Sequence, residues 1–282
     1  MTADNTNNKL KIPFTGERFT PETRGNVQLE HQHRYLVASQ IVEGKVVVDI
    51  ASGEGYGSDI LSKTAKHVYG IDIDPQAIEH AKKRYNKENI TFLTGNCVNI
   101  PLDNDSVDVI ISFETLEHIV EQDEMLLDIK RILHKDGILI MSTPIKNDNA
   151  LVHHKFHVKE LYQDEFNNLV SKYFKNVNIY FQDIIYASLI YLDKNLATFS
   201  GYEIVDDNTI KINDRNIFSK FSLALASDAE LPNLNTSILE PKPRSKQVIQ
   251  NIYIVVSMLK LENIFNKLFN CIRYIYKKIT GK

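Results

Sequence analysis

Cysteine is scarce in this chain, and the two that occur, Cys97 and Cys271, are far apart in the sequence. Two distant cysteines argue against a disulfide framework and are typical of a reducing compartment, so we expect a cytoplasmic protein. The polar N-terminus lacks the apolar core of a secretion signal. The chain also lacks a run of about 18 apolar residues, so we expect no segment that spans a bilayer.

Net charge is small as well, at −3 over 282 residues. The basic excess of a general nucleic-acid-binding surface is missing, which argues against DNA as a partner and disfavours RNA. Hydrophobic residues make up 43% of the chain and charged residues 24%, which is typical of a globular protein. The length suits one enlarged α/β domain or one domain with a tail.

Continuous apolar runs alternate with helical patterns through much of the chain. Runs such as VVVDI and VDVIIS are typical of parallel strands covered on both faces. The expected strands are 46–50, 67–71, 90–93, 107–112, 138–142, 177–181 and 221–226. The expected helices are 28–42, 57–64, 76–85, 121–133 and 158–172. Strict alternation of the two predicts an α/β fold with a doubly wound sheet.

The domain organisation follows from shifts in composition. We expect a flexible N-terminal segment at 1–27 and the α/β domain at 28–228. Residues 183–218 read as an insertion between the last two strands that covers the active site and shapes the acceptor pocket. A proline-containing linker at 229–247 and a helical tail at 248–282 complete the chain.

The most informative segment is 46–57, with the sequence VVVDIASGEGYG. A β-branched strand runs into Asp49, and Gly53, Gly55 and Gly57 follow at alternate positions before a helix. A glycine-rich turn after a strand lets the backbone approach a ligand and aims the N–H groups of the next helix at it. The spacing differs from the G-x-G-x-x-G of dinucleotide-binding proteins. The segment predicts a nucleotide-type site at the end of this strand.

This loop, followed by Asp72 at the end of the next strand, resembles class I methyltransferases that use S-adenosylmethionine (SAM). The resemblance implies a Rossmann-like fold with a seven-stranded, mostly parallel sheet and an antiparallel last strand. It implies that the loop wraps the amino-acid end of SAM and that Asp72 binds the ribose diol, since a carboxylate accepts two hydrogen bonds. Asn96 stands where the family often has an aspartate that contacts the adenine amino group. The implied cofactor-binding residues are Asp49, Ala51, Ser52, Gly53, Gly55, Asp72, Ile73, Asn96, Cys97 and Phe113.

A second element follows the fourth strand and reads FETLEHI. If it is helical from Glu114, then Glu114, Glu117 and His118 share one face and form a candidate divalent-metal half-site. A histidine of the segment 153–157 could complete it. The pattern E-x-x-E-H with a later H-x-x-E resembles metal-dependent 2′-O-methyltransferases that act on the 3′ end of small RNAs. That resemblance implies Mg²⁺ or Mn²⁺ held by Glu114, Glu117, His118 and His157.

Three interpretations of these catalytic candidates, Glu114, Glu117 and His118, stay open. In the first, a metal ion polarises a substrate hydroxyl and lowers its pKa. In the second, His118 or Glu117 acts as a general base without metal. In the third, the element is a surface turn and its histidine only packs or is solvated.

A further resemblance concerns the methyl acceptor. The segments GERFTPE (16–22) and LEHQHRYLVA (29–38), with the elements above, resemble a branch of this superfamily common in surface-polysaccharide loci. The implied acceptor is a sugar hydroxyl of a cell-surface glycan or its precursor. Because fold-level analogy does not set substrate, a quinone-type phenol, an RNA 3′-terminal ribose and a non-catalytic scaffold remain alternatives. His31, Arg34 and Tyr35 share a helix face that could roof the cofactor pocket or be merely solvated.

The tail places apolar residues at helical spacing with lysines and an arginine between them. A basic amphipathic helix can lie on an anionic membrane surface. Residues 257–282 are therefore candidates for peripheral contact with the inner face of the membrane. Packing on the domain and a homodimer contact are the alternatives.

Overall fold

The computed structural model describes residues 26–147, 154–184, 188–192, 200–206, 209–214, 221–234 and 237–239. The chain divides into two units, Met1–Glu240 and Pro241–Lys282, and all described residues belong to the first. The predictions made for 1–25 and for the tail at 248–282 lie outside the described residues, as does His153. Among the helices of the described part, none is long and apolar enough to cross a membrane.

A parallel run of five strands forms one side of the central sheet. β1 (Val46–Ile50) pairs with β2 (His67–Asp72) on one edge and with β4 (Val107–Phe113) on the other. β3 (Ile90–Thr94) lies beyond β2, and β5 (Leu133–Pro144) lies beyond β4. The carboxyl ends of these strands therefore meet at one edge of the sheet, where ligands of open α/β sheets bind.

The antiparallel part of the sheet starts at β10 (Phe221–Ser227), which pairs with both β5 and β6 (Asn176–Ile184). This confirms the expected antiparallel last strand. Two strands beyond the expected seven, β7 (Ser188–Leu192) and β11 (Ser237–Leu239), give the order β11-β7-β6-β10-β5-β4-β1-β2-β3. β7 comes from the expected insertion and β11 from the expected linker.

The rest of the described insertion forms a second, two-stranded sheet. β8 (Ser200–Asp206) and β9 (Thr209–Asp214) pair antiparallel in it. The role expected for the insertion, to cover the active site, stays a prediction.

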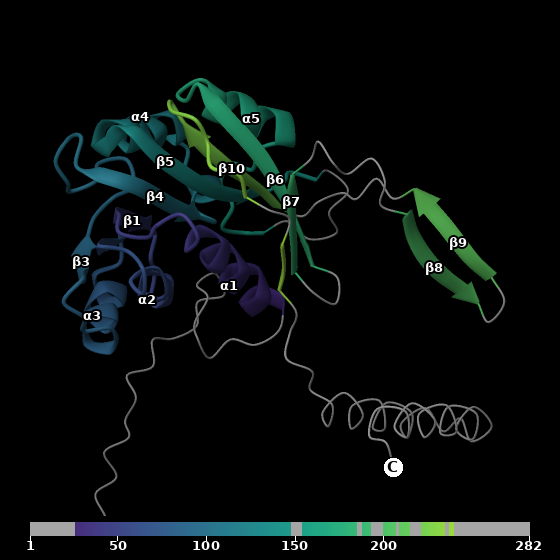
Figure 1. Cartoon of the computed structure of the whole chain (residues 1–282), viewed down its shortest axis with the longest axis horizontal. Coiled ribbons are helices and arrows are strands. Elements are labelled where there is room, and N and C mark those ends of the chain that lie inside the picture. Colours follow the sequence, from purple (N-terminus) through teal and green to yellow (C-terminus); the bar gives the residue numbers. More distant parts are fainter. Residues whose placement is uncertain are drawn as a thin grey trace, which may run out of the picture. The chain divides into compact units, whose positions relative to one another are not determined.

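Helices cover the large sheet on both faces (Figure 1). α1 (Asn26–Ala38), α2 (Tyr56–Leu61) and α3 (Pro75–Arg84) lie on one face. α4 (Gln122–Ile132) and α5 (Gln163–Ser171) lie on the other. This is the doubly wound arrangement that the alternating pattern predicted.

The packing of strand β1 shows why its sequence is apolar except at Asp49. Val47 packs with Leu61 in the core on the α1 and α2 face, whereas Val48 and Ile50 pack with Met125 in the core on the α4 face. Successive side chains of a strand point to opposite faces. Because helices cover both faces here, each of these positions must be apolar.

Helix α5 begins at Gln163, five residues later than the predicted start at 158. The backbone N–H groups of Val158 and Lys159 donate to the carbonyl of Glu117, at 2.8 and 3.0 Å. These bonds hold the segment in a non-helical path against the site, so the helix forms only after it.

The segment after β4 also differs from its prediction. Only Leu116–His118 is helical, as a single 3₁₀ turn, and Glu114 lies in the left-handed region with φ 54°. The N–H of Glu114 donates to the carbonyl of Ser142 at 3.1 Å, which prolongs the pairing of β4 with β5. The predicted helical face shared by Glu114, Glu117 and His118 is therefore wrong.

Candidate functional site

The glycine loop leaves β1 by a sharp turn. Ala51, Gly53 and Gly55 all have left-handed φ angles, of 57°, 55° and 83°. Glycine adopts this region freely, but a residue with a Cβ rarely does. Ala51 is thus a strained position, and such positions gather at functional sites.

Asp49 lies beneath this loop and is fully buried. It accepts hydrogen bonds from the hydroxyls of Tyr35 on α1, at 2.9 Å, and Ser58 on α2, at 2.7 Å. Burial raises the pKa of Asp49 from 3.8 to about 7. A Cβ on Gly57 would lie 2.0 Å from the Tyr35 ring, so a glycine is required for α1 to pack this closely. Asp49 therefore braces the loop against both helices.

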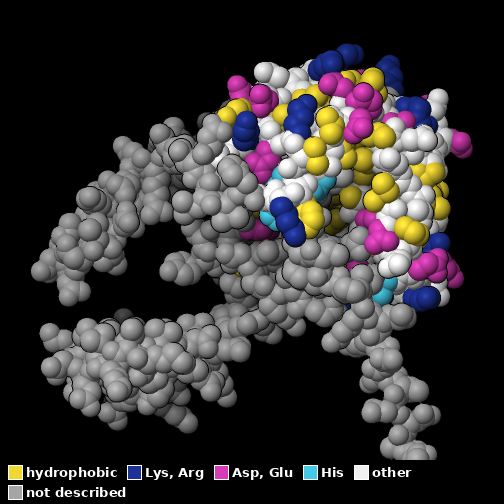
Figure 2. Space-filling model, turned by 180° about the vertical axis from the view of Figure 1, so that it is seen from behind, with side chains coloured by type: hydrophobic (Ala, Val, Ile, Leu, Met, Phe, Trp, Pro, Cys, Tyr) yellow, Lys and Arg dark blue, Asp and Glu magenta, His cyan; other side chains and the backbone are white. Residues whose placement is uncertain are grey.

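A pocket of about 340 Å³ opens at the carboxyl ends of β1, β2 and β4. Five of the predicted cofactor-binding residues line it, namely Ala51, Asp72, Ile73, Asn96 and Cys97. Figure 2 shows histidine side chains beside a hollow in the surface that hydrophobic side chains line. The volume and the largely apolar wall with a few polar groups are typical of small-molecule sites.

The other predicted cofactor-binding residues, Asp49, Ser52, Gly53, Gly55 and Phe113, are not among those that line the pocket. Asp49 and Ser52 are buried behind it. Phe113 packs edge-on against Tyr35, with ring centroids 5.0 Å apart. Asp49 and Phe113 thus pack behind the site, and their contact with the cofactor stays a prediction.

Asp72 has the position and the hydrogen-bonding capacity expected for a ribose ligand. One of its carboxylate oxygens accepts from the N–H of Gly53 at 2.8 Å, and the other from the N–H of Asp74 at 2.9 Å. A carboxylate has about four acceptor sites, so two remain for a vicinal diol. The two backbone bonds fix the orientation of the carboxylate at the pocket wall.

The loop after β3 carries Asn96 and Cys97 along the pocket. The side-chain oxygen of Asn96 accepts from the N–H of Val98 at 3.1 Å, so it already shapes this loop. Burial raises the pKa of the Cys97 thiol, which is therefore neutral at physiological pH. Neutral Cys97 is a packing residue of the wall.

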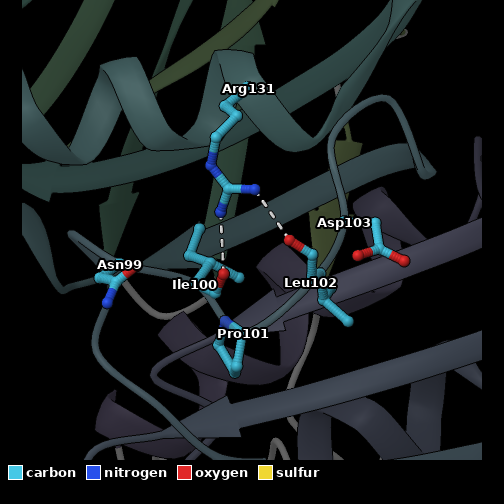
Figure 3. Close-up of a pocket in the computed structure, with 6 residues that line it drawn as sticks. All are labelled: Asn99, Ile100, Pro101, Leu102, Asp103 and Arg131. Atoms are coloured by element: carbon cyan, nitrogen blue, oxygen red, sulfur yellow. Dashed lines mark hydrogen bonds between the residues drawn. The ribbon is translucent and has the colours of Figure 1, made fainter.

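Arg131 of α4 holds the far end of the same loop. It donates from Nη2 to the carbonyl of Ile100 and from Nη1 to that of Leu102, both at 2.8 Å (Figure 3). Asp128 accepts from the N–H of Ile100 at 2.5 Å. The hollow drawn in Figure 3 shares no lining residue with the cofactor pocket, and its arginine braces the loop.

Glu114 lines the cofactor pocket and is held from two sides. Its Oε1 accepts from the Ser142 hydroxyl at 2.8 Å and lies 3.1 Å from Nη1 of Arg34. The ion pair connects α1 to the end of β4. A non-glycine residue at φ 54° is strained, and these contacts keep Glu114 there.

Glu117 is buried, with a 1% exposed side chain. The Thr143 hydroxyl donates to Oε2 at 3.1 Å, and Oε1 has no hydrogen-bond partner among the described residues. Burial, and after it the nearby charge of Glu114, raises the pKa of Glu117 well above its usual value. A buried carboxyl with one unsatisfied oxygen is protonated or serves as a ligand for a cation.

His118 and His157 lie beside Glu117 with their rings 5.2 Å apart. Nδ1 of His118 is 3.1 Å from the carbonyl oxygen of Phe156. Nδ1 of His157 contacts the carboxylate of Glu160. A carbonyl and a carboxylate only accept, so both Nδ1 atoms carry a proton, and in the neutral form of either imidazole the lone pair is on Nε2.

Three of the four predicted metal ligands therefore come together. Glu117, His118 and His157 each offer one ligand atom, and these atoms all lie within 4.8 Å of one another. The oriented Nδ1–H groups are what metal-binding histidines usually have. Glu114 is not part of this group, because Arg34 and Ser142 hold its carboxylate. The residues fit a divalent cation with two nitrogen ligands and one oxygen ligand.

Three further residues line the pocket that were not predicted from the sequence, namely Thr115, Ile119 and Glu121. Their position after β4, at the carboxyl edge of the sheet, was the signal that could have found them. Arg34 was among the α1 residues that could roof the pocket or be solvated, and the structure buries it. Its ion pair with Glu114 had no signal in the sequence, since it depends on how α1 packs.

Comparisons with known proteins agree with this geometry. Residues 48–141 match a family model described as a methyltransferase domain. A probable S-adenosylmethionine-dependent methyltransferase of Mycolicibacterium smegmatis is 30% identical over 167 residues, which are 56% of this chain and 63% of the relative. The chain thus spans less than two thirds of that relative.

Two solved structures share the fold. The methyltransferase in the complex with the Haloferax volcanii Trm112 activator is 18% identical, with a TM-score of 0.52 over 72% of this chain and 90% of that one. A SAM-dependent methyltransferase of Thermotoga maritima is 16% identical, with a TM-score of 0.51 over 72% and 91%. The described residues thus have the Rossmann-like α/β fold of these two structures.

Proposed function

We propose that this chain, in which residues 48–141 form a methyltransferase domain, is an enzyme that transfers a methyl group from SAM to a sugar hydroxyl of a cell-surface glycan or its precursor. The observation that carries the proposal is the position of His118. It lines the cofactor pocket, and its Nδ1 proton is engaged by the carbonyl of Phe156. A neutral imidazole held in this tautomer at the cofactor pocket suits an acceptor that must lose a proton.

SAM supplies an electrophilic methyl group on a sulfonium sulfur. The acceptor oxygen bonds to the methyl carbon while the carbon–sulfur bond breaks, and S-adenosylhomocysteine leaves. The hydroxyl proton passes to Nε2 of His118, which makes an imidazolium whose Nδ1–H still donates to Phe156. Alignment of the reacting atoms supplies much of the remaining rate enhancement, up to about 7–11 kcal/mol.

The sugar acceptor rests on the resemblance of segments 16–22 and 29–38 to enzymes of polysaccharide loci. A transfer assay with labelled SAM should therefore mark nucleotide sugars or oligosaccharides. Quinone-type phenols and RNA with a free 3′-terminal ribose complete the panel. Labelling of the phenol alone or of the RNA alone would overturn the sugar assignment and leave the methyltransferase in place.

A second candidate mechanism places a divalent cation on Glu117, His118 and His157. The buried Oε1 of Glu117, which accepts no hydrogen bond among the described residues and lies 3.8 Å from Nε2 of His118, supports it, as do the oriented imidazoles. A cation there would polarise the acceptor hydroxyl and lower its pKa. In that mechanism His118 and Glu117 bind and orient, and neither takes the proton.

His118→Gln and His157→Gln form a matched pair that separates the two mechanisms. An amide can still donate to the partner of Nδ1 but has no basic nitrogen. If His118 is the base, its variant should lose about 10²–10⁴ in kcat, whereas His157→Gln stays active and EDTA has no effect. If a cation is held, both variants lose activity, and EDTA abolishes turnover until Mn²⁺ or Mg²⁺ is added.

The proposed function itself is tested by binding. Isothermal titration calorimetry of the full chain with S-adenosylhomocysteine should show a micromolar or tighter site. Absence of binding at high micromolar ligand would sink the proposal and favour a scaffold that kept only the fold. Full kcat in His118→Gln, measured in EDTA, would remove the general-base role.

A further inference from the structure

We propose that Arg34 and Glu114 form a two-charge clamp for the amino-acid end of SAM, in which Arg34 takes the carboxylate and Glu114 the ammonium. The inference rests on the proposed function, because it concerns how the same pocket holds its methyl donor. It adds a residue of α1 to a site otherwise built from the carboxyl ends of strands.

Arg34 is an unusual buried cation. Its side chain is 1% exposed and lies over the Phe221 ring, 4.3 Å from the centroid. Nε donates to Oε1 of Gln182 at 2.7 Å, and Nη1 lies 3.1 Å from Oε1 of Glu114. Nη2 has no hydrogen-bond partner among the described residues. A buried guanidinium with unused donors indicates a partner that arrives with a ligand.

Strand order places the amino-acid end of SAM beside this pair. Asp72, which we assign to the ribose, follows β2, and Asn96 and Cys97 follow β3. The sheet runs β4-β1-β2-β3. A ligand with its ribose over β2 and its base toward β3 must extend its amino-acid end over β1 and β4. Glu114 stands at the end of β4 and lines the pocket there.

The charges of the pair complement those of the ligand. The amino-acid end of SAM carries a carboxylate and an ammonium on one carbon atom. Glu114 uses Oε1 for both of its described contacts, with Ser142 and Arg34, which leaves Oε2 as an acceptor for the ammonium. Arg34 has the donor that a carboxylate requires, and a planar guanidinium binds carboxylates with defined geometry.

The position of the clamp is fixed by neighbours on both sides. Tyr35, next to Arg34, donates to the buried carboxylate of Asp49 and packs tightly on Gly57. Glu114 follows β4 directly, and the Ser142 hydroxyl holds its carboxylate. Both groups are therefore in place before the ligand binds, which lowers the entropy that binding costs.

Ligands that lack one charge at a time test the clamp by calorimetry on the full chain. The set is S-adenosylhomocysteine, its decarboxylated analogue, and 5′-methylthioadenosine, which lacks both charges. Arg34→Gln should lower the affinity for S-adenosylhomocysteine about 10- to 100-fold. The affinities for the other two ligands should stay nearly unchanged. Glu114→Gln should lower the affinities for S-adenosylhomocysteine and for the decarboxylated analogue by the same factor. The affinity for methylthioadenosine should not change. Arg84→Gln, on the exposed side of α3, should change no affinity.

A purely structural role gives a different pattern. If Arg34 only latches α1 to β4, Arg34→Gln weakens all three ligands equally or none of them, and either result overturns the clamp. Arg34→Lys keeps the charge and serves if the glutamine variant fails to fold; it should preserve part of the selectivity for the carboxylate. Failure of wild-type protein to bind S-adenosylhomocysteine would instead overturn the proposed function.

Discussion

The buried carboxyl of Asp49 should make the stability of this protein fall as the pH rises toward neutrality. Its pKa is about 7 in the folded protein and 3.8 as an ordinary aspartate. Between these values the native state holds a proton that the unfolded state has lost. Stability falls wherever the native state binds more protons, so this contribution is complete below pH 3.8 and is lost as the pH rises through about 7.

The magnitude follows from the two pKa values. A difference of about 3 corresponds to about 4 kcal/mol at about 1.4 kcal/mol each. Asp49→Asn removes the ionisation and keeps the hydrogen bonds. The amide oxygen accepts from Tyr35, and the Ser58 hydroxyl, which both donates and accepts, turns to accept from the amide nitrogen.

Urea unfolding of the ligand-free protein from pH 4.5 to 8 is the assay. The stability of wild-type protein relative to Asp49→Asn should fall by about 3 kcal/mol across this range. Asp228→Asn is the matched control, because Lys130 lowers the pKa of Asp228 below 3.8, so its contribution is lost only at lower pH and its curve should run parallel to that of wild type from pH 4.5 to 8. Parallel curves for wild type and Asp49→Asn would refute the assignment of a raised pKa to Asp49.

Two further substitutions test the cofactor loop. Asp72→Ala should weaken S-adenosylhomocysteine by about 1.5–3 kcal/mol in calorimetry, because the ribose diol loses a charged acceptor; unchanged affinity would contradict the ribose assignment. Gly57→Ala should destabilise the fold by about 1–3 kcal/mol in urea, since its Cβ would lie 2.0 Å from the Tyr35 ring, and an alanine variant as stable as wild type would show that α1 is free to move.

The strands were predictable from sequence because their determinants are local. β1, buried on both faces, has a run of the same length as the strand in which every residue but Asp49 is apolar, and its predicted range of 46–50 is the observed one. Helix α3 was nearly as clear, with Pro75 in its first turn and three basic residues in its last. Each of these elements carries the signals for its own limits.

The start of α5 was not predictable in this way. Residues 158–162 have a sequence compatible with a helix, but the N–H groups of Val158 and Lys159 bond to the carbonyl of Glu117, about forty residues earlier. The local preference of these residues for a helix is outweighed by the hydrogen bonds that the distant carbonyl accepts. Tertiary contacts override local propensity in such segments.

In the E-x-x-E-H element, too, the local pattern failed to predict the backbone, and here the difference affects the proposed function. Periodicity placed Glu114 with Glu117 and His118 on one helical face, as three of the four implied metal ligands. In the structure the backbone at Glu114 is left-handed, so the element divides into two parts. Glu114 turns toward Arg34 of α1, whereas Glu117 and His118 face His157.

In the function that we propose, this division gives each part of the element a different task. Arg34 contacts Gln182 and Glu114, which are 148 and 80 residues away in the chain, so the helix-face pattern of α1 could suggest a place near the pocket but could not identify these partners. Once α1 packs, Glu114 has a cationic partner and is available to the charged end of the methyl donor. Glu117, His118 and His157 remain for the acceptor hydroxyl. If Glu114 were a metal ligand instead, Arg34→Gln would free its carboxylate and increase the affinity for Mn²⁺, whereas our assignment requires that this affinity stay the same.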